Sequence, residues 1–253
     1  MTAARRKQKI LEMTGRGREC SVHELADEFD VSEMTVRRDL ADLADQGRIV
    51  RTHGGAAPAS GVMFEFRFLN RGHENRSQKE AIARVAAKKV NDGNTVILDS
   101  GTTTLILSEA LRANKDLTIV TTSLPVASKL QYCDGIDIVL LGGRLRHDTP
   151  DLMGALTLRN LEEVRADCAF IGADAIDEEG VVYNESIEVA HLLRTMSKAA
   201  DQVYIVADSS KLGKAALARI GSLTEWNGLI TDESANDATV EKLRENGVEV
   251  FLP

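Results

Sequence analysis

The spacing of apolar residues changes along the chain, and this change separates a short first part from a longer second part. Up to residue 44, apolar positions recur every three or four residues, as they do on one face of an amphipathic helix. This spacing predicts helices over residues 3–13, after Ser21 and after Ser32. Ser21 with Glu24 forms a capping box, which marks a helix start. Residues 48–55 alternate instead and end on two glycines, which predicts a small β-hairpin.

In the second part, short apolar runs alternate with helical stretches. The predicted strands cover residues 95–98, 117–120, 136–141, 168–171, 203–207, 228–230 and 248–252. The predicted helices cover residues 77–91, 103–113, 124–132, 155–165, 186–200 and 235–246. This order is typical of an α/β domain with a mostly parallel, Rossmann-like sheet that is covered on both faces. Ligands of such sheets bind at the carboxyl ends of the strands.

Charge and composition support two domains with different partners. The chain has 253 residues, of which 43% are hydrophobic, and a net charge of −8. Basic and acidic residues are equal in number in residues 1–54, so the negative charge belongs to the remainder. The small residues of AAPASGVM, at 56–63, indicate a linker. We therefore predict domains at residues 1–56 and 76–253, joined by a linker over residues 57–75.

Several classes of protein are excluded by the same inspection. No apolar run approaches the ~20 residues of a membrane span, and the basic N-terminus is not followed by the apolar segment of a secretory signal. The three cysteines are far apart and have no zinc-site spacing. We expect a reduced cytoplasmic protein with no membrane partner, no metal and no cofactor.

The helix after Ser32 has two different faces. Val36, Leu40 and Leu43 share one face, and Met34, Thr35 and Arg38 lie on the opposite one. Two short helices, a tight turn at residues 30–31 and a hairpin together favour a winged helix-turn-helix, in which this helix would enter the major groove of DNA. A capped surface helix with solvated arginines is the alternative interpretation. The candidate DNA-binding residues are Ser32, Glu33, Met34, Thr35, Arg37, Arg38, Arg51 and His53.

LDSGTTT, at residues 98–104, follows a predicted strand and begins a predicted helix. Amides at a helix N-terminus attract anions, and the glycine lets a ligand approach the backbone. Lys211 follows another strand end and would supply a cation for the same phosphate. The alternatives are an ordinary helix cap and a solvated lysine. The candidate effector-binding residues are Asp99, Ser100, Gly101, Thr102, Thr103, Thr104, Thr121, Ser123, Leu124, Gly142, Gly143, Arg144, Gly172, Asp174 and Lys211.

The sequence of residues 31–56, VSEMTVRRDLADLADQGRIVRTHGGA, resembles the signature of the DeoR family of bacterial transcription regulators. KEAIA, LDSGTTT, LLGG, FIGADAI, VADSSK and LITD follow in the order expected for that family. The resemblance implies an operator-binding head and a sensor domain related in fold to ribose-5-phosphate isomerase. It also implies repression of sugar or nucleoside genes that ends when a phosphorylated sugar binds.

We therefore predict a DNA-binding regulator, a repressor of carbohydrate genes that a phosphorylated sugar releases from double-stranded operator DNA. Palindromic half-sites need paired heads, which predicts a homo-dimer or tetramer. The alternative is an isomerase-like enzyme with a regulatory head. The resemblance to the isomerase implies a lysine and a glutamate base after its GADE-like loop. Here no lysine follows GADAID until Lys198, and Glu185 and Glu188 are available but are more simply first-turn helix acids, so we predict no catalytic residues. A second alternative is an empty sensor domain that serves only to oligomerise.

Overall fold

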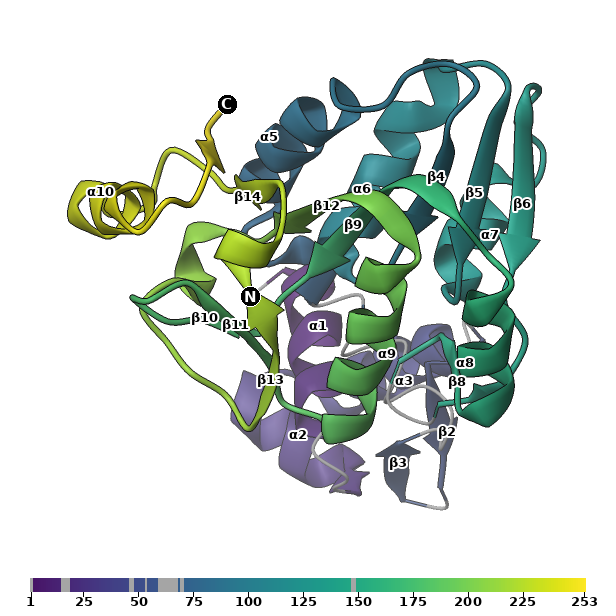
Figure 1. Cartoon of the computed structure of the whole chain (residues 1–253). Helices are drawn as coiled ribbons and strands as arrows, with labels where there is room; N and C mark the ends of the chain where they lie inside the picture. The colour runs from purple at the N-terminus through teal and green to yellow at the C-terminus, as the bar shows by residue number, and fades with distance from the viewer. Residues whose placement is uncertain are drawn as a thin grey trace. The chain divides into compact units, whose positions relative to one another are not determined.

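The computed structural model describes residues 2–14, 19–45, 48–52, 54–58, 68, 71–146 and 149–253. The chain divides into two compact units (Figure 1). The N-terminal unit comprises Met1–Asn70 with His147–Thr149, and the C-terminal unit comprises Arg71–Arg146 with Pro150–Pro253. None of the helices in the described parts of the chain is long and apolar enough to cross a membrane.

Among its described residues, the N-terminal unit has the helices α1 to α3 and a three-stranded antiparallel sheet of order β1-β3-β2. The helices are α1 (Ala3–Thr14), α2 (Val22–Phe29) and α3 (Glu33–Asp45), and the strands are β1 (Cys20–Ser21), β2 (Ile49–Arg51) and β3 (Gly55–Pro58). The predicted helices and hairpin are confirmed. β3 extends to Pro58, two residues past the predicted domain boundary, because residues 57–58 pair with β2.

Local interactions set the ends of these helices. The side chain of Ser21 accepts a hydrogen bond from the Glu24 amide at 3.1 Å, which confirms the predicted cap. α2 ends at Asp30, which adopts a left-handed conformation with φ of 51°. Ser32 Oγ accepts from the Thr35 amide at 3.3 Å at the start of α3. The two helices are thus joined by the tight turn that a helix-turn-helix requires.

The C-terminal unit is built on a seven-stranded sheet of order β15-β14-β12-β9-β4-β5-β6, in which every neighbouring pair is parallel (Figure 1). Its strands are β4 (Thr95–Leu98), β5 (Leu117–Thr121), β6 (Ile136–Leu140), β9 (Ala166–Gly172), β12 (Ala200–Val206), β14 (Gly228–Ile230) and β15 (Val250–Phe251). The α-helices are α5 (Arg76–Ala87), α6 (Thr102–Ala110), α7 (Leu124–Leu130), α8 (Ala155–Glu162), α9 (Ile187–Lys198) and α10 (Asp237–Glu245). Short 3₁₀ helices are η1 (Leu111–Ala113), η2 (Ser209–Lys211) and η3 (Leu223–Glu225).

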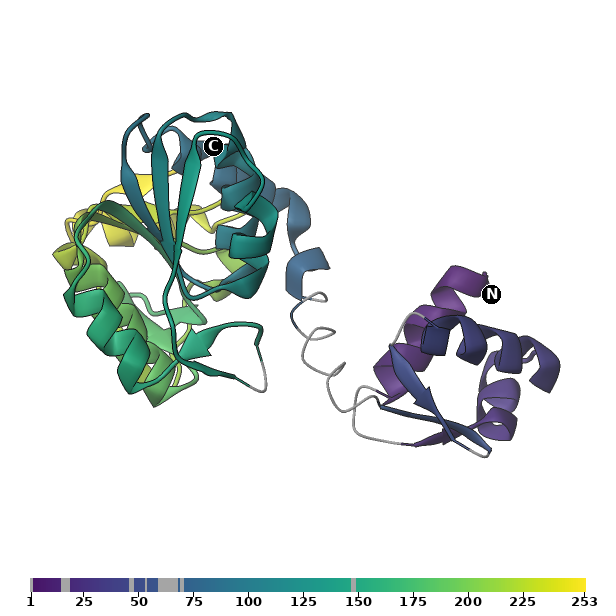
Figure 2. The ribbon, with the colours of Figure 1, turned by 90° about the vertical axis from the view of Figure 1, so that its right-hand side faces the viewer.

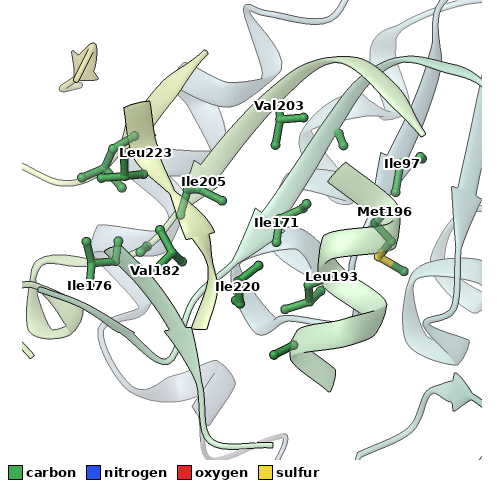
Figure 3. Close-up of a cluster of buried hydrophobic side chains, with 14 of the residues drawn as sticks. Ile97, Ile171, Ile176, Val182, Leu193, Met196, Val203, Ile205, Ile220 and Leu223 are labelled. Carbon is green, nitrogen blue, oxygen red and sulfur yellow. The ribbon is translucent and has the colours of Figure 1, made fainter. Parts of the chain in front are cut away.

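Both faces of the sheet are covered, as the sequence predicts. Figure 2 shows the blue and teal helices α5, α6 and α7 on one side and the green helices α8 and α9 on the other. Alternate strand residues supply the two cores: Phe170 faces the α5–α7 side, and Ile171 faces the α8–α9 side (Figure 3). This alternation follows from the two-residue period of a strand.

Two small features lie outside the predicted pattern. One is an antiparallel sheet of β10 (Ala175–Ile176), β11 (Val181–Asn184) and β13 (Ala218–Ser222). The other is the hairpin of β7 (Arg144–Leu145) and β8 (Leu152–Met153). These strands lack the continuous apolar runs that mark the strands of the main sheet, so the sequence alone does not reveal them.

The strand order reverses between β4 and β9. From β4 the chain proceeds to β5 and β6 on one side, whereas β9 leads to β12, β14 and β15 on the other. At such a switch point the connections after the two strands leave in opposite directions and open a crevice at the carboxyl ends. The residues after β4 and β9 are therefore the place to look for a ligand site.

Candidate functional site

The exposed face of α3 carries the candidate DNA-reading side chains. Met34 is 70% exposed and Arg37 and Arg38 are also exposed, while the opposite face with Val36, Leu40 and Leu43 is buried. The predicted division of this helix is confirmed. Arg37 is partly engaged, because its guanidinium lies 3.1 Å from the Glu33 carboxylate one turn earlier.

The remaining candidates of this unit are distributed around α3. Ser32 lies at its start, and Thr35 is half-buried with its hydroxyl 3.0 Å from that of Ser32. Arg51 is exposed on β2, the first strand of the wing. His53 lies outside the described residues.

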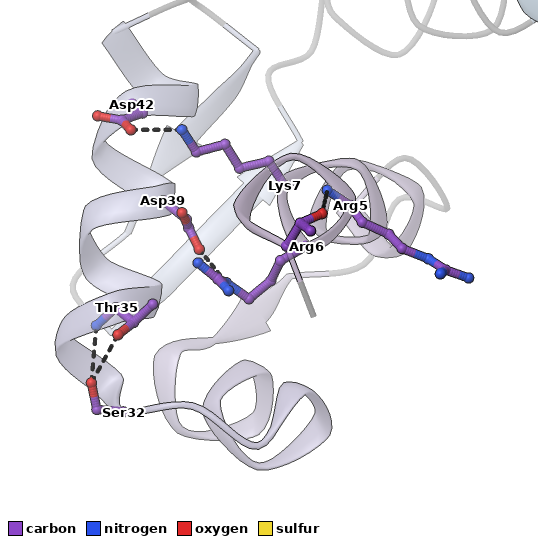
Figure 4. Close-up of polar contacts among 8 residues, drawn as sticks. Arg5, Arg6, Lys7, Ser32, Thr35, Asp39 and Asp42 are labelled. Carbon is purple, nitrogen blue, oxygen red and sulfur yellow. Dashed lines mark hydrogen bonds and ion pairs between the residues drawn. The ribbon is translucent and has the colours of Figure 1, made fainter.

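Two ion pairs join α3 to α1 (Figure 4). Arg6 Nε lies 2.5 Å from Asp39 Oδ2, and both side chains are almost fully buried. Lys7 Nζ lies 2.6 Å from Asp42 Oδ2 one turn further along α3. Sequence inspection missed this contact, because a charged residue on α1 gives no local signal of a partner on another helix.

In the C-terminal unit, the carboxylate of Asp99 fastens the ends of β4 and β9 together. Its Oδ1 accepts from the Gly101 amide and from Thr104 Oγ1, each at 2.7 Å. Its Oδ2 accepts from the Gly172 amide at 2.6 Å. A Cβ on Gly101 or Gly172 would lie 3.0 or 3.1 Å from these oxygens, so both glycines make room for the carboxylate. Four candidate residues are thus held in one buried network.

Burial raises the pKa of Asp99 above its usual range, and the nearby Asp151 carboxylate adds to the rise. The hydrogen bonds from Thr104, Gly101 and Gly172 oppose it, because they favour the charged form. Both carboxylate oxygens of Asp99 already accept hydrogen bonds from the protein, so Asp99 stabilises the conformation of the turn from its buried side.

Asp151 joins the turn to the end of β5. Its Oδ2 accepts from Ser100 Oγ and its Oδ1 from Arg146 Nε, both at 2.8 Å, and it is 1% exposed. A β-bridge joins Asp151 to Ser123, which is itself the N-cap of α7. Asp151 is not among the candidates predicted from the sequence, because a lone aspartate gives no signal of such a bridge.

The candidates after β5 are buried and bonded. Thr121 Oγ1 donates to the carbonyl of Leu98 at 2.7 Å and accepts from the Ser123 amide at 3.1 Å. The Leu124 amide donates to the carbonyl of Pro150 at 3.0 Å. The structure therefore brings the ends of β4, β5 and β9 into one polar framework.

Lys211 ends η2, the turn after β12, and is half-buried. Asp208 caps this turn by accepting from the Ser210 amide at 3.1 Å. Lys79 of α5 lies close enough to both that Asp208 and Lys211 act on its pKa, which burial lowers. Lys79 is a further cation at this edge that sequence inspection quoted only as part of the family pattern.

The remaining effector-site candidates contact residues outside this polar framework. Arg144 is exposed, with its guanidinium 3.8 Å from Glu188 of α9. The carboxylate of Asp174 accepts from the Glu185 amide at 3.0 Å. Gly142 accepts from Thr157 Oγ1 at 2.8 Å, and Gly143 passes so close to that hydroxyl that a Cβ would lie 2.2 Å away.

The first turn of α6 provides amides for an anion. Its hydrogen-bond ladder begins with the Leu105 amide donating to the carbonyl of Gly101 at 3.0 Å, so the amides of Thr102, Thr103 and Thr104 precede it. Such amides, together with the helix dipole, attract negative charge. Among the described residues, no group of His, Cys, Asp and Glu side chains is placed to hold a metal ion.

Comparisons with known proteins match the two units separately. The family model described as the DeoR-like helix-turn-helix domain matches residues 6–61, and the one described as the DeoR C terminal sensor domain matches residues 74–233. The glycerol-3-phosphate regulon repressor of Escherichia coli is 32% identical over 253 residues, which is 100% of each chain. The HTH-type transcriptional repressor GlcR of Bacillus subtilis is 34% identical over 243 residues, 96% of this chain and 93% of that protein.

Among solved structures, ribose 5-phosphate isomerase A from Methanocaldococcus jannaschii matches with a TM-score of 0.40 and 22% identity. The match covers 55% of each chain, a likeness too weak to support a conclusion about function.

Proposed function

This chain belongs to the DeoR family of transcriptional regulators, and we propose that it is a cytoplasmic repressor that a phosphorylated sugar releases from operator DNA. Both relatives described above are named as repressors. One is the glycerol-3-phosphate regulon repressor, and the other is the transcriptional repressor GlcR. The polar framework around the turn would select which sugar phosphate binds.

The observation that carries the effector proposal is the placement of the start of α6 at the switch point of the sheet. The phosphate would bind to the amides of Thr102–Thr104, with Lys211 as its cation. Asp99 would hold the turn in place from its buried side, without touching the effector. Ser100 donates its hydroxyl hydrogen to Asp151, so Asp151 would hold the Ser100 side chain in place beside the turn.

The acids near the site do not favour the enzyme alternative. Glu185 and Glu188 are exposed, and both oxygens of Asp99 already accept hydrogen bonds from the protein. A general base has to lie within hydrogen-bond reach of the proton that it removes, with a pKa tuned to the task. We propose that the sensor domain binds its ligand without converting it; turnover of any pentose phosphate above buffer would overturn this.

Lys211→Ala tests the effector site. This variant should bind operator DNA as the wild type does but fail to release it when sugar phosphates are added. The control is Lys198→Ala, on an exposed lysine at the end of α9. A thermal-shift screen of phosphorylated sugars on the full chain identifies the ligand, because a bound ligand raises stability by mass action. Release at wild-type concentrations would show that Lys211 is not a ligand.

Arg38→Ala tests the DNA face. If Arg38 contacts a base edge, its loss should weaken operator binding by about 1–3 kcal/mol and relax specificity at one position. Arg84→Ala, on an exposed residue of α5, is the control. We further propose that a homo-dimer or tetramer presents paired heads to a palindromic operator; a monomer bound at full affinity would contradict this.

A further inference from the structure

Residues 71–75 are the first residues of the C-terminal unit and follow the last residue of the N-terminal unit directly in sequence. They comprise a helical turn over residues 71–73 and Asn75, which has a left-handed φ of 51° and precedes α5. A change in the conformation of this segment therefore changes the start of the covalent connection to the N-terminal unit.

A buried lysine holds the segment from one side. Lys79 is 5% exposed, and its ammonium donates to the backbone carbonyls of Arg71 and of Glu74, the latter at 2.7 Å. A charged group is buried at a cost unless its hydrogen bonds are satisfied. These two carbonyls accept the hydrogen bonds of the ammonium, so the backbone conformation of residues 71–74 and the position of Lys79 depend on each other.

Asn75 ties the same segment to the turn after β12. Its side-chain amide donates to Asp208 Oδ1 at 2.9 Å and to Ser210 Oγ at 3.4 Å. Asp208 Oδ1 also accepts from the amide and hydroxyl of Ser210, at 3.1 and 2.5 Å. Lys211 is the next residue of this turn, so the cation proposed for the effector and the anchor of Asn75 belong to one short piece of backbone.

The segment also lies against the other wall of the effector site. A Cβ added to Gly72 would lie 4.0 Å from Thr102 Cγ2, so Gly72 is a near neighbour of the first residue of α6. Residues 71–75 thus lie beside the α6 turn at Gly72 and are hydrogen-bonded to the η2 turn through Asn75.

We propose that residues 71–75 are a coupling segment that links occupancy of the effector site to the linker, with Asn75 and Lys79 as its positioning residues. The inference rests on the proposed effector site. A phosphate bound between the α6 amides and Lys211 draws η2 and the α6 turn towards it. Asp208 caps η2 and moves with it. Its hydrogen bond to Asn75, together with the two backbone carbonyls that accept from Lys79, then favours one arrangement of residues 71–75 over another. A ligand shifts an equilibrium only through such differential contacts.

The test measures two quantities on the full-length chain with inorganic phosphate as the probe, at constant ionic strength set with chloride because salt itself weakens DNA binding. One is the thermal stability of the C-terminal unit, and the other is affinity for operator DNA. The variants are Asn75→Gly, which removes the amide but permits the positive φ, and Lys79→Met. Their controls are Asn246→Gly and Lys88→Met, on exposed residues that end α10 and α5.

In the wild type and controls, phosphate should stabilise the C-terminal unit and weaken operator binding by at least about fivefold, the lower end of typical coupling. In Asn75→Gly and Lys79→Met the stabilisation should persist, while the weakening falls below about twofold. Operator binding that responds to phosphate in both variants as in the wild type overturns the coupling segment. If phosphate does not stabilise even the wild type, the effector site itself is wrong and the coupling inference is lost with it.

Discussion

Replacing Arg6 by methionine removes the guanidinium that pairs with Asp39 and leaves that carboxylate buried between α1 and α3. The two side chains are only 8% and 5% exposed, so the pair is not a surface ion pair of about 0–1 kcal/mol. Removing one partner of a buried pair costs about 3–5 kcal/mol, because the remaining charge keeps its desolvation penalty.

The size of the N-terminal unit makes this loss decisive. A domain below about 70–80 residues rarely derives more than about 3–5 kcal/mol from its core. The core of this unit is one cluster, which includes Ile10, Leu25, Val36 and Leu40. We expect Arg6→Met to remove most of the free energy of unfolding of the N-terminal unit and to abolish operator binding. The C-terminal unit should stay folded.

The cysteines report on each unit separately. Cys20 is fully buried in the N-terminal core, and Cys168 is buried in the C-terminal sheet. In a Cys133→Ser background, the labelling rate of each thiol tracks how often its unit opens, as long as reclosing outpaces the reagent. At tenfold per 1.4 kcal/mol, Arg6→Met should speed labelling of Cys20 on the order of 100- to 4,000-fold, with Cys168 unchanged.

The double variant Arg6→Met, Asp39→Leu is the control for chain length and volume. It replaces both charges by apolar groups, which is often neutral or stabilising for a buried pair. Its Cys20 labelling should return to within about tenfold of the wild type. If Arg6→Met alone labels within threefold of the wild type, the buried charge costs nothing and the reasoning is refuted.

Three further outcomes follow from the same structure. Asp99→Asn should lower the stability of the C-terminal unit by about 1–3 kcal/mol, because an amide nitrogen would face one of the three donors; an unchanged urea midpoint contradicts this. Gly143→Ala should cost about 1–3 kcal/mol, since its Cβ would lie 2.2 Å from a hydroxyl of α8 and 2.7 Å from a carbonyl of β8. Gly142→Ala, where the nearest atom is 3.6 Å away, should be tolerated in the same unfolding assay. In the native protein only Cys133 should react promptly with a thiol reagent, because burial raises the pKa of Cys168 to about 12; a second prompt thiol would be the contrary result.

The strands of the main sheet and the helices α1, α2 and α3 were predictable, because each is specified by its own residues. Strand runs such as residues 95–98 and 228–230 coincide with β4 and β14, and Ser21 caps α2 as its capping box predicts. The small sheet of β10, β11 and β13 was not predictable, because β13 pairs with a strand some forty positions earlier and β10 is only two residues long. The sequence predicted that polar residues gather at the carboxyl ends of β4, β5 and β9, but not which hydrogen bonds each side chain makes there.

The sequence by itself determined the helix and strand periods, the helix caps and the two faces of α3, all of which arise from residues within a few positions of one another. Only the tertiary structure decided which charges are buried and paired. Arg6 meets Asp39 across 33 positions, Ser100 meets Asp151 across 51, Asp99 meets Gly172 across 73, and Asn75 meets Asp208 across 133. Such contacts leave no local pattern, because the energy of a buried polar group depends on the partner that the fold brings to it.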